Sequence, residues 1–181
     1  ASGLSGKGRM EEPEEIANAI EDFFTSNKPL AGRKALVTAG PTYENIDPVR
    51  FIGNYSSGKM GFAIAEALSN QGAQVTLVSG PSALQNTNPD IKLIKVTSAL
   101  EMMEACENAF PTVNITVMAA AVADYRPRVT ADSKIKREKK GAFSIDLIPN
   151  PDIIKTLGSA KTDGQYLLGF ALETNNAEEN A

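Results

Sequence analysis

The residues that could carry chemistry in this chain begin in one long loop. Residues 38–61, TAGPTYENIDPVRFIGNYSSGKMG, join a predicted strand to a predicted helix, a connection that usually takes about 2–6 residues. In doubly wound folds, long loops at the carboxyl end of the first strand bind ligands. Ser56, Ser57 and Gly58 come at the predicted helix start, where free amides and the helix dipole favour phosphate. Capping by Ser57 is the simpler alternative, but it does not account for the length of the loop.

The loop comes close to a P-loop motif without matching it. Within GNYSSGKM, residues 53–60, Met60 stands where a Ser or Thr would ligate magnesium, so P-loop chemistry is not expected. Two polar residues of the loop could instead bind a substrate. Arg50 could clamp a carboxylate or phosphate with two hydrogen bonds, and Asn54 could hold an acyl group without adding charge. A role as a turn residue is the alternative for Asn54.

Four later segments are further candidates. In AAAVADY, residues 119–125, small side chains would let a ligand approach the backbone, and Asp124 would suit a ribose hydroxyl or a metal; a simple turn is the alternative. In the basic run SKIKREKK, residues 133–140, Lys134 could fold over phosphates, whereas a solvated face is the usual role of such runs. We expect this run to be mobile without a polyanion. IPNPDI at 148–153 could be only a rigid turn, and Phe170 could belong to the core or stack on a base.

The composition narrows the chemistry. The 181 residues include no histidine, which excludes His-dependent nucleophiles and His-containing metal sites. A single cysteine, Cys106, excludes a cysteine-rich zinc site and an intrachain disulfide. The formal net charge of -4 argues against a general nucleic-acid binder. No apolar run approaches the roughly 20 residues of a membrane-spanning helix and no signal core is present, so we expect a cytoplasmic protein without a membrane partner.

Short apolar runs alternate with helical patterns along the chain. The predicted strands are residues 34–38, 74–79, 91–96, 115–121, 143–148 and 165–172. The predicted helices are residues 58–71, 98–110 and 151–157, the second beginning with a capping box of Ser98 and Glu101. Continuous apolar strands that alternate with helices indicate a parallel sheet covered on both faces. We therefore predict a Rossmann-like, doubly wound, mostly parallel α/β fold.

The two ends of the chain read differently from its middle. EEPEEIANAIEDFF predicts a helix from Pro13, with a mobile tail as the alternative. We place a boundary here, so that residues 1–30 precede a domain of residues 31–181. The chain stops inside a helical pattern that follows Thr174 and Asn175. Because doubly wound sheets usually continue, we expect a fragment truncated at its C-terminus.

Five ordered motifs, LVTAGPTYENIDPVRFIGNYSSGKMG, AAAVADYRP, SKIKR, NPDI and GFALETN, resemble bacterial phosphopantothenate–cysteine ligase. This family is commonly the C-terminal half of a bifunctional coenzyme A biosynthesis protein. The resemblance covers about residues 33–181. Residues 1–26 resemble the end of the flavoprotein decarboxylase half, although Ser2 stands where that half often has a cysteine.

The resemblance implies a two-step ligation of 4'-phosphopantothenate with cysteine through an acyl-cytidylate. It implies that Asn54 holds the intermediate, that Arg50 supports its loop and that Lys134 lies near the triphosphate, whereas replacing Lys140 should matter little. The implied CTP-binding residues are Gly40, Ser56, Ser57, Gly58, Met118, Ala119, Ala120, Asp124, Lys134, Asn150, Pro151, Asp152, Ile153 and Phe170.

The family also implies cofactors and partners. CTP would be used with Mg²⁺, whose ligands the sequence does not identify, and FMN would belong only to the decarboxylase domain, which is absent here. A homodimer of the ligase domain, with a site built across the interface, and a larger oligomer in the full-length fusion are implied. The alternatives are a nicotinamide-dependent oxidoreductase, against which Pro41 replaces the required glycine turn, and a non-catalytic nucleotide-binding fragment.

Overall fold

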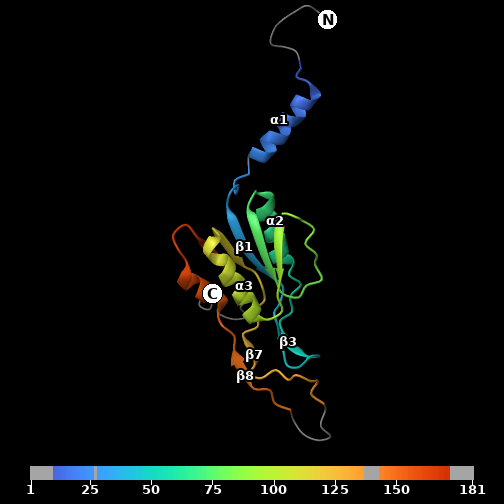
Figure 1. The fold of residues 1–181 in the computed structure, drawn as a ribbon, viewed down its shortest axis with the longest axis vertical. Coiled ribbons are helices and arrows are strands. Elements are labelled where there is room, and N and C mark those ends of the chain that lie inside the picture. The colour runs from blue at the N-terminus through green and yellow to red at the C-terminus, as the bar shows by residue number, and fades with distance from the viewer. Residues whose placement is uncertain (1–9, 27, 137–142, 172–181) are drawn as a thin grey trace, which may run out of the picture.

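The centre of the molecule is a five-stranded parallel sheet (Figure 1). The computed structural model describes residues 10–26, 28–136 and 143–171. The strand order is β5 (Ile91–Lys95), β4 (Gln74–Ser79), β1 (Lys34–Ala39), β6 (Ile115–Met118) and β9 (Tyr166–Gly169). Val37 of β1 pairs with Leu77 on one side and Val117 on the other. The short apolar runs therefore form the strands of the sheet, but those predicted over residues 115–121 and 165–172 end earlier, at Met118 and Gly169, and the edge strand β9 is mostly exposed.

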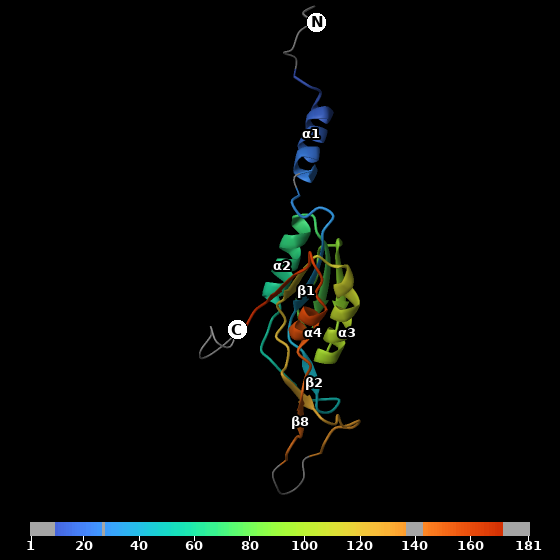
Figure 2. The same ribbon diagram turned by 90° about the vertical axis from the view of Figure 1, so that its left-hand side faces the viewer.

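Helices cover both faces of the sheet (Figure 2). The helix α2 (Lys59–Asn70) lies on one face; α3 (Ala99–Ala109), the short 3-10 helix Phe110–Thr112 and α4 (Ile153–Ala160) lie on the other. Side chains alternate along β1, so Ala35 and Val37 pack toward α2 while Leu36 packs toward α3 and α4. The predicted doubly wound α/β architecture is confirmed.

Two short antiparallel strand pairs form an arm beyond the carboxyl end of the sheet (Figure 1). One pair is β2 (Tyr43–Asn45) with β3 (Phe51–Gly53), and the other is β7 (Tyr125–Pro127) with β8 (Leu147–Pro149). The sequence did not predict the first three of these strands. The strand predicted over residues 143–148 is wrong in its first four residues, because its partner β7 is only three residues long and the paired strand β8 begins at Leu147.

The structure confirms the predicted start of α3 and corrects the predicted start of α4. Ser98 caps α3, its hydroxyl accepting from the Glu101 amide at 3.3 Å. The Glu101 carboxylate returns to the amide of Thr97 at 2.7 Å, one residue before the expected partner. The helix predicted from residue 151 begins at Ile153 instead, because the Asp152 side chain caps it.

The helix α1 (Pro13–Ser26) forms as predicted and stands away from the sheet (Figures 1 and 2). Its apolar side chains Ile20 and Phe24 are exposed. The domain boundary near residue 30 stays a prediction. The expectations for Ser2, for residues 137–140 of the basic run, and for the helix after Thr174 lie outside the described residues. None of the helices in the described part combines the length and apolarity that crossing a membrane requires.

Cys106 of α3 gives a test of the packing between α3 and the sheet. The residue is fully buried, and burial raises the pKa of its thiol to about 12 from an ordinary value of 9.0. We expect no reaction with a thiol reagent at pH 8 until the chain unfolds in denaturant. Because the folded pKa lies above the unfolded one, the thiol's contribution to stability is lost as pH rises from about 9 toward 12.

Chemical denaturation between pH 8 and 11 measures this effect, with Cys106→Ala as the control. The wild type should lose stability with a slope up to about 1.4 kcal/mol per pH unit steeper than that of the variant. Rapid stoichiometric labelling of the native protein would contradict the buried position.

Candidate functional site

The site lies where the strand order of the sheet reverses, between β1 and β6. Ligands of open α/β sheets bind outside the carboxyl ends of the strands at such a point. The segments after these two strands run side by side: the Thr42 amide donates to the Ala121 carbonyl at 3.2 Å, and the Ala121 amide donates to the Gly40 carbonyl at 2.9 Å. The two segments therefore form one continuous wall.

Two buried threonines hold this wall together. The hydroxyl of Thr38 accepts from the amides of Ala119 and Ala120 at 3.1 and 3.2 Å. The hydroxyl of Thr42 accepts from the Ala123 amide at 2.9 Å. Because both amides already donate to Thr38, only the carbonyl oxygens of Ala119 and Ala120 remain to bind a base. Sequence reasoning missed both threonines, because a lone threonine near a strand end forms no motif.

A cavity of about 490 Å³ opens beside the wall, at the ends of β6 and β9 and the start of α4. Its size is typical of small-molecule sites. Eight predicted nucleotide-binding residues line it: Met118, Ala120, Asp124, Asn150, Pro151, Asp152, Ile153 and Phe170. A larger hollow of about 710 Å³ reaches Lys34 and Gln74 at the amino ends of β1 and β4, away from the edge where such folds bind ligands.

Asn150 supports the cavity with its side chain. Its Nδ2 donates to the Ala123 carbonyl at 2.7 Å, and its Oδ1 accepts from the Arg126 guanidinium at 3.0 Å. The same guanidinium nitrogen donates to the Pro149 carbonyl at 2.8 Å. Sequence reasoning missed Arg126, which fixes the turn between β8 and α4. The amide group of Asn150 is thus bonded to the protein. If this turn contacts a base as predicted, other atoms of the turn make the contact.

Phe170 and Asp124 present their side chains at the mouth of the cavity. Phe170 is 53% exposed and therefore does not belong to the core, which favours the stacking alternative. Asp124 is exposed and supplies a carboxylate. The other carboxylate of the lining, that of Asp152, accepts from the Lys155 amide at 2.9 Å and so caps α4.

Two glycines bring the start of α2 against the wall. Gly40 and Gly58 have φ values of 74° and 81°, which side chains with a Cβ rarely adopt. A Cβ on Gly58 would lie 3.2 Å from the Gly40 nitrogen, so the close approach itself depends on glycine. The hydroxyl of Ser82 donates to the Ser57 carbonyl at 2.8 Å and fixes the loop from the other side.

The serines of this loop satisfy part of the helix start themselves. The Ser56 hydroxyl accepts from the Gly58 amide at 3.3 Å, and the Ser57 hydroxyl accepts from the Lys59 amide at 3.4 Å. Both distances are long for such bonds. Gly58 rather than Ser57 is the N-cap of α2, and no side-chain cap bond is made, so capping by Ser57 is not found; phosphate binding by this loop stays a prediction.

Asn54 links the long loop to the wall. Its Nδ2 donates to the carbonyls of Val122 and Ala121, at 3.0 and 3.5 Å. The two loops that carried the strongest sequence signals are thus brought into contact. Because the two N–H donors point at main-chain oxygens, Oδ1 is the atom of this side chain left to meet a ligand.

Arg50 makes a bidentate contact with Asp47 of the protein itself. Its Nε and a terminal nitrogen donate to the carboxylate of Asp47, whose side chain is buried. The amides of Val49 and Arg50 also donate to this carboxylate, at 2.8 and 2.9 Å. The guanidinium and these amides hold the pKa of Asp47 well below its usual range. Sequence reasoning missed Asp47, although an Asp that starts a tight turn was a usable signal.

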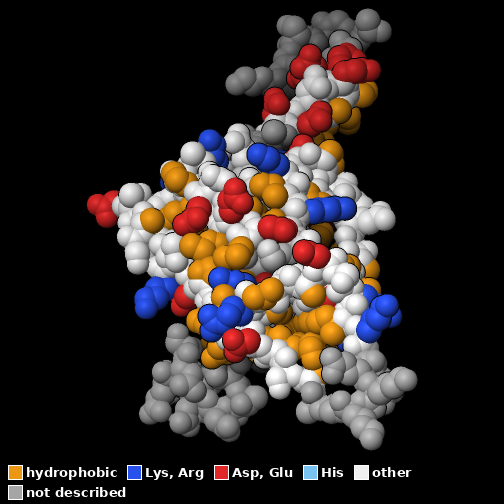
Figure 3. All heavy atoms as spheres, turned by 60° about the horizontal axis from the view of Figure 1, so that its bottom comes forward, with side chains coloured by type: hydrophobic (Ala, Val, Ile, Leu, Met, Phe, Trp, Pro, Cys, Tyr) orange, Lys and Arg blue, Asp and Glu red, His pale blue; other side chains and the backbone are white. Residues whose placement is uncertain are grey.

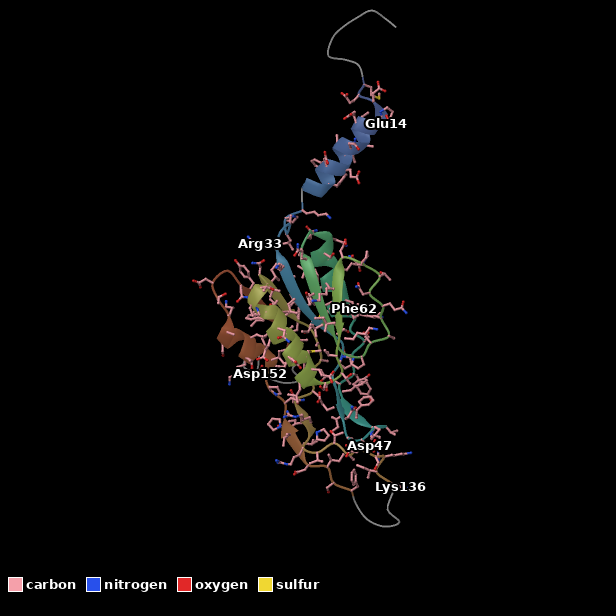
Figure 4. All side chains as sticks on the ribbon, viewed as in Figure 1. Glu14, Arg33, Asp47, Phe62, Lys136 and Asp152 are labelled. Carbon is pink, nitrogen blue, oxygen red and sulfur yellow. The ribbon has the colours of Figure 1, made fainter. Side chains whose placement is uncertain are left out.

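The described part of the basic run lies against this Asp47–Arg50 turn (Figure 4). The Ile135 amide donates to the Asp47 carboxylate at 3.1 Å, and the Ile135 carbonyl accepts from Arg50 at 2.8 Å. Lys134 and Lys136, on either side, are exposed. These bonds tie the main chain of Ile135 to the turn without any polyanion, and the mobility expected of the run stays a prediction. Figure 3 shows basic and hydrophobic side chains close together on this end of the molecule.

The donor set fits a magnesium ion that is bound mainly through a ligand. Among the described residues, no three acidic or cysteine side chains come together as a metal site. Mg²⁺ usually takes one or two carboxylates together with substrate phosphates. Asp124 is the carboxylate of the cavity that could take part.

Residues 30–181 match the family described as the DNA/pantothenate metabolism flavoprotein C-terminal domain, and the chain belongs to this family. It is 50% identical over 181 residues to the coenzyme A biosynthesis bifunctional protein CoaBC of Haemophilus influenzae, covering 100% of this chain and 45% of that protein. It is also 52% identical over 185 residues to a cysteine/cysteine sulfinic acid decarboxylase of an unknown prokaryotic organism, covering 100% of this chain and 51% of that protein.

A solved structure identifies the matching half. The crystal structure of the C-terminal domain of a CoaBC protein has a TM-score of 0.73 and 48% identity, over 85% of this chain and 71% of that one. The chain spans about half the length of the curated relatives it matches. The resemblance to the ligase half of a bifunctional coenzyme A biosynthesis protein is therefore confirmed at the level of family and fold. The oxidoreductase alternative is not supported, since residues 40–58 separate the end of β1 from the start of α2 in the sequence and no short glycine turn joins them.

Proposed function

We propose that this chain carries the phosphopantothenate–cysteine ligase activity of a coenzyme A biosynthesis protein. The observation that carries the proposal is the cavity at the switch point of the sheet, where segments from three separate motifs meet. The similarity to CoaBC proteins supports the same pathway. A protein of the same fold, 17% identical and with a TM-score of 0.68, has been solved in complex with phosphopantothenate-cysteine; that likeness concerns the fold.

In the first step, the carboxylate of 4'-phosphopantothenate attacks the α-phosphorus of CTP. An acyl-cytidylate forms and pyrophosphate leaves. This reaction needs positioned charge and hydrogen bonds rather than a protein nucleophile, which suits a chain without histidine. The cavity would take the cytidine, with Phe170 against the base, and Lys134 would lie at the phosphates.

In the second step, the amine of cysteine attacks the acyl carbon. The new amide bond forms as the bond to the phosphate oxygen breaks, CMP leaves, and the amine loses a proton. Asn54 would hold the intermediate during this attack, because its donors fix the side chain and leave Oδ1 as an acceptor for the amine. Arg50 would support the same loop through Asp47.

Bound Mg²⁺ would offset the negative charge of the triphosphate, and Asp124 is the residue we assign to it. FMN would belong to the other half of the bifunctional protein. We also propose a homodimer that completes the site, and a larger oligomer in the fusion. Exposed apolar side chains on the arm support such an interface: Val49, Phe51, Tyr55, Val129 and Leu147.

The test of the function is the choice of nucleotide. We expect the intact protein to release pyrophosphate from CTP faster than from ATP, with phosphopantothenate and magnesium present. The physical reason is geometric: a main-chain carbonyl near Ala120 can accept from the amino group of cytosine, whereas the larger purine places its amino group at a different distance from the ribose. A coupled pyrophosphate assay at equal nucleotide concentrations measures this.

Three outcomes would contradict the proposal in different ways. Faster turnover of ATP would exclude the CTP assignment. CTP binding without turnover would support the non-catalytic alternative. Release of carbon dioxide from cysteine without any nucleotide would instead support the activity for which the 52% identical relative is named.

A further inference from the structure

Asp47 is a buried charge that the proposed reaction does not use. The residue is 1% exposed, and its carboxylate receives hydrogen bonds from the amides of Val49 and Arg50, from the Arg50 guanidinium and from the Ile135 amide. A carboxylate is taken out of water only where its partners replace the lost hydration. One of these partners, Ile135, lies 88 residues further along the chain. The carboxylate therefore joins two segments as well as stabilising its own turn.

The same two segments are tied together at a second place. The hydroxyl of Thr130 donates to the Asn45 carbonyl at 3.0 Å, and the Ala131 amide donates to the Ile46 carbonyl at 3.0 Å. Residues 130–135 thus run along the loop between β2 and β3 and are fixed at both ends. Between and beside these anchors the side chains of Lys134 and Lys136 remain exposed.

We propose that Asp47 is a positioning residue, whose carboxylate holds the main chain of Ile135 so that Lys134 and Lys136 are presented to the phosphates of the nucleotide. The amide and the carbonyl of Ile135 are both bonded to the turn, so the exposed lysines on either side project from a main chain that is already anchored. Binding then does not have to order this part of the backbone, which lowers the entropic cost of the contact.

The ligand in this inference rests on the proposed function, whereas the anchoring of Ile135 does not. The experiment therefore has two readouts on Asp47→Asn in the intact protein. The first is limited trypsin digestion without nucleotide, with cleavage after Lys134 and Lys136 measured by mass spectrometry. Losing a hydrogen bond to a charged group should raise this cleavage about tenfold or more, with cleavage after Lys92 unchanged.

The second readout is steady-state kinetics. Asp47→Asn should raise KM for CTP about tenfold, while KM for phosphopantothenate changes less than about twofold. The matched control is Asp146→Asn, which removes the exposed ion pair with Arg128 on the same arm and should change neither readout. If Asp47→Asn does not fold, Ile135→Pro removes the same hydrogen bond from the other side, and cleavage after Lys136 is then compared.

The outcomes separate the two proposals. Unchanged cleavage after Lys134 and Lys136 in a folded variant overturns the positioning role. Cleavage that rises equally at Lys92, with a matching loss of thermal stability, overturns it as well, because Asp47 would then be only structural. If Asp47→Asn is cleaved faster but the wild-type protein never releases pyrophosphate from CTP, the anchoring of Ile135 is supported and the proposed function is overturned.

Discussion

Replacing Asn54 with Asp should reduce the ligated product by about 100-fold or more while pyrophosphate release persists in part. The substitution removes both N–H donors from Val122 and Ala121 and sets a negative charge against their carbonyl oxygens. It also places a carboxylate beside the anionic acyl-phosphate. Losing one positioned polar group at a reacting centre typically costs about 10²–10³ in rate. The acyl-cytidylate should therefore accumulate.

Quenched reactions analysed for acyl-cytidylate, pyrophosphate and ligated product measure the two steps separately. Asn108→Asp on the exposed side of α3 is the matched control, since it makes the same change of charge far from the site. An Asn54→Asp protein that ligates cysteine at the normal rate would remove Asn54 from the mechanism.

Replacing Lys134 with Gln should lower kcat/KM for CTP by about 10–100-fold. A charge-assisted contact to phosphate is worth roughly 1.5–3 kcal/mol where water is excluded, and glutamine keeps most of the length of the side chain without its charge. Lys92→Gln on the edge strand β5 is the control and should stay within about twofold of the wild type. Steady-state kinetics and titration calorimetry with CTP give the comparison.

Equal activity of Lys134→Gln and the wild type would mean that the described part of the basic run is a solvated face. Ile135 would then be anchored for stability alone, and the assignment of Lys134 to the triphosphate would fail.

The sequence predicted the sheet well because its strands are continuous apolar runs. The run at residues 74–79 matches β4, and the capping signal at Ser98 matches the start of α3. The arm escaped prediction because three-residue strands such as β2 carry too few side chains to show a period of two, and Glu44 in its middle reads as a loop residue. That carboxylate is buried and accepts from the Ala99 amide at 2.9 Å, which fixes β2 against α3.

The motifs predicted which residues line the cavity, but not what each side chain does. Asn150 was expected to face a ligand, yet Arg126 and the Ala123 carbonyl take up its amide group. The role of such a side chain depends on hydrogen-bond partners from distant segments of the sequence. Hydrophobic periodicity does not predict pairs such as Asn54 with Val122. The contact of Asp47 with Ile135 was beyond sequence reasoning for the same reason.

The contacts that build the site determine when the site forms relative to the sheet during folding. The bonds of Asn54 and Asp47 join residues 68 and 88 positions apart, much like the pairing of β1 with β6, but each is an isolated contact rather than part of a strand ladder. Long loops cost the most entropy to close, so these bonds form only once the sheet has brought their partners near. In mild denaturant we expect these long-range bonds to break before the sheet unfolds. Many apolar side chains of the arm are exposed, so we expect the site to lose its geometry while the five-stranded sheet is still intact.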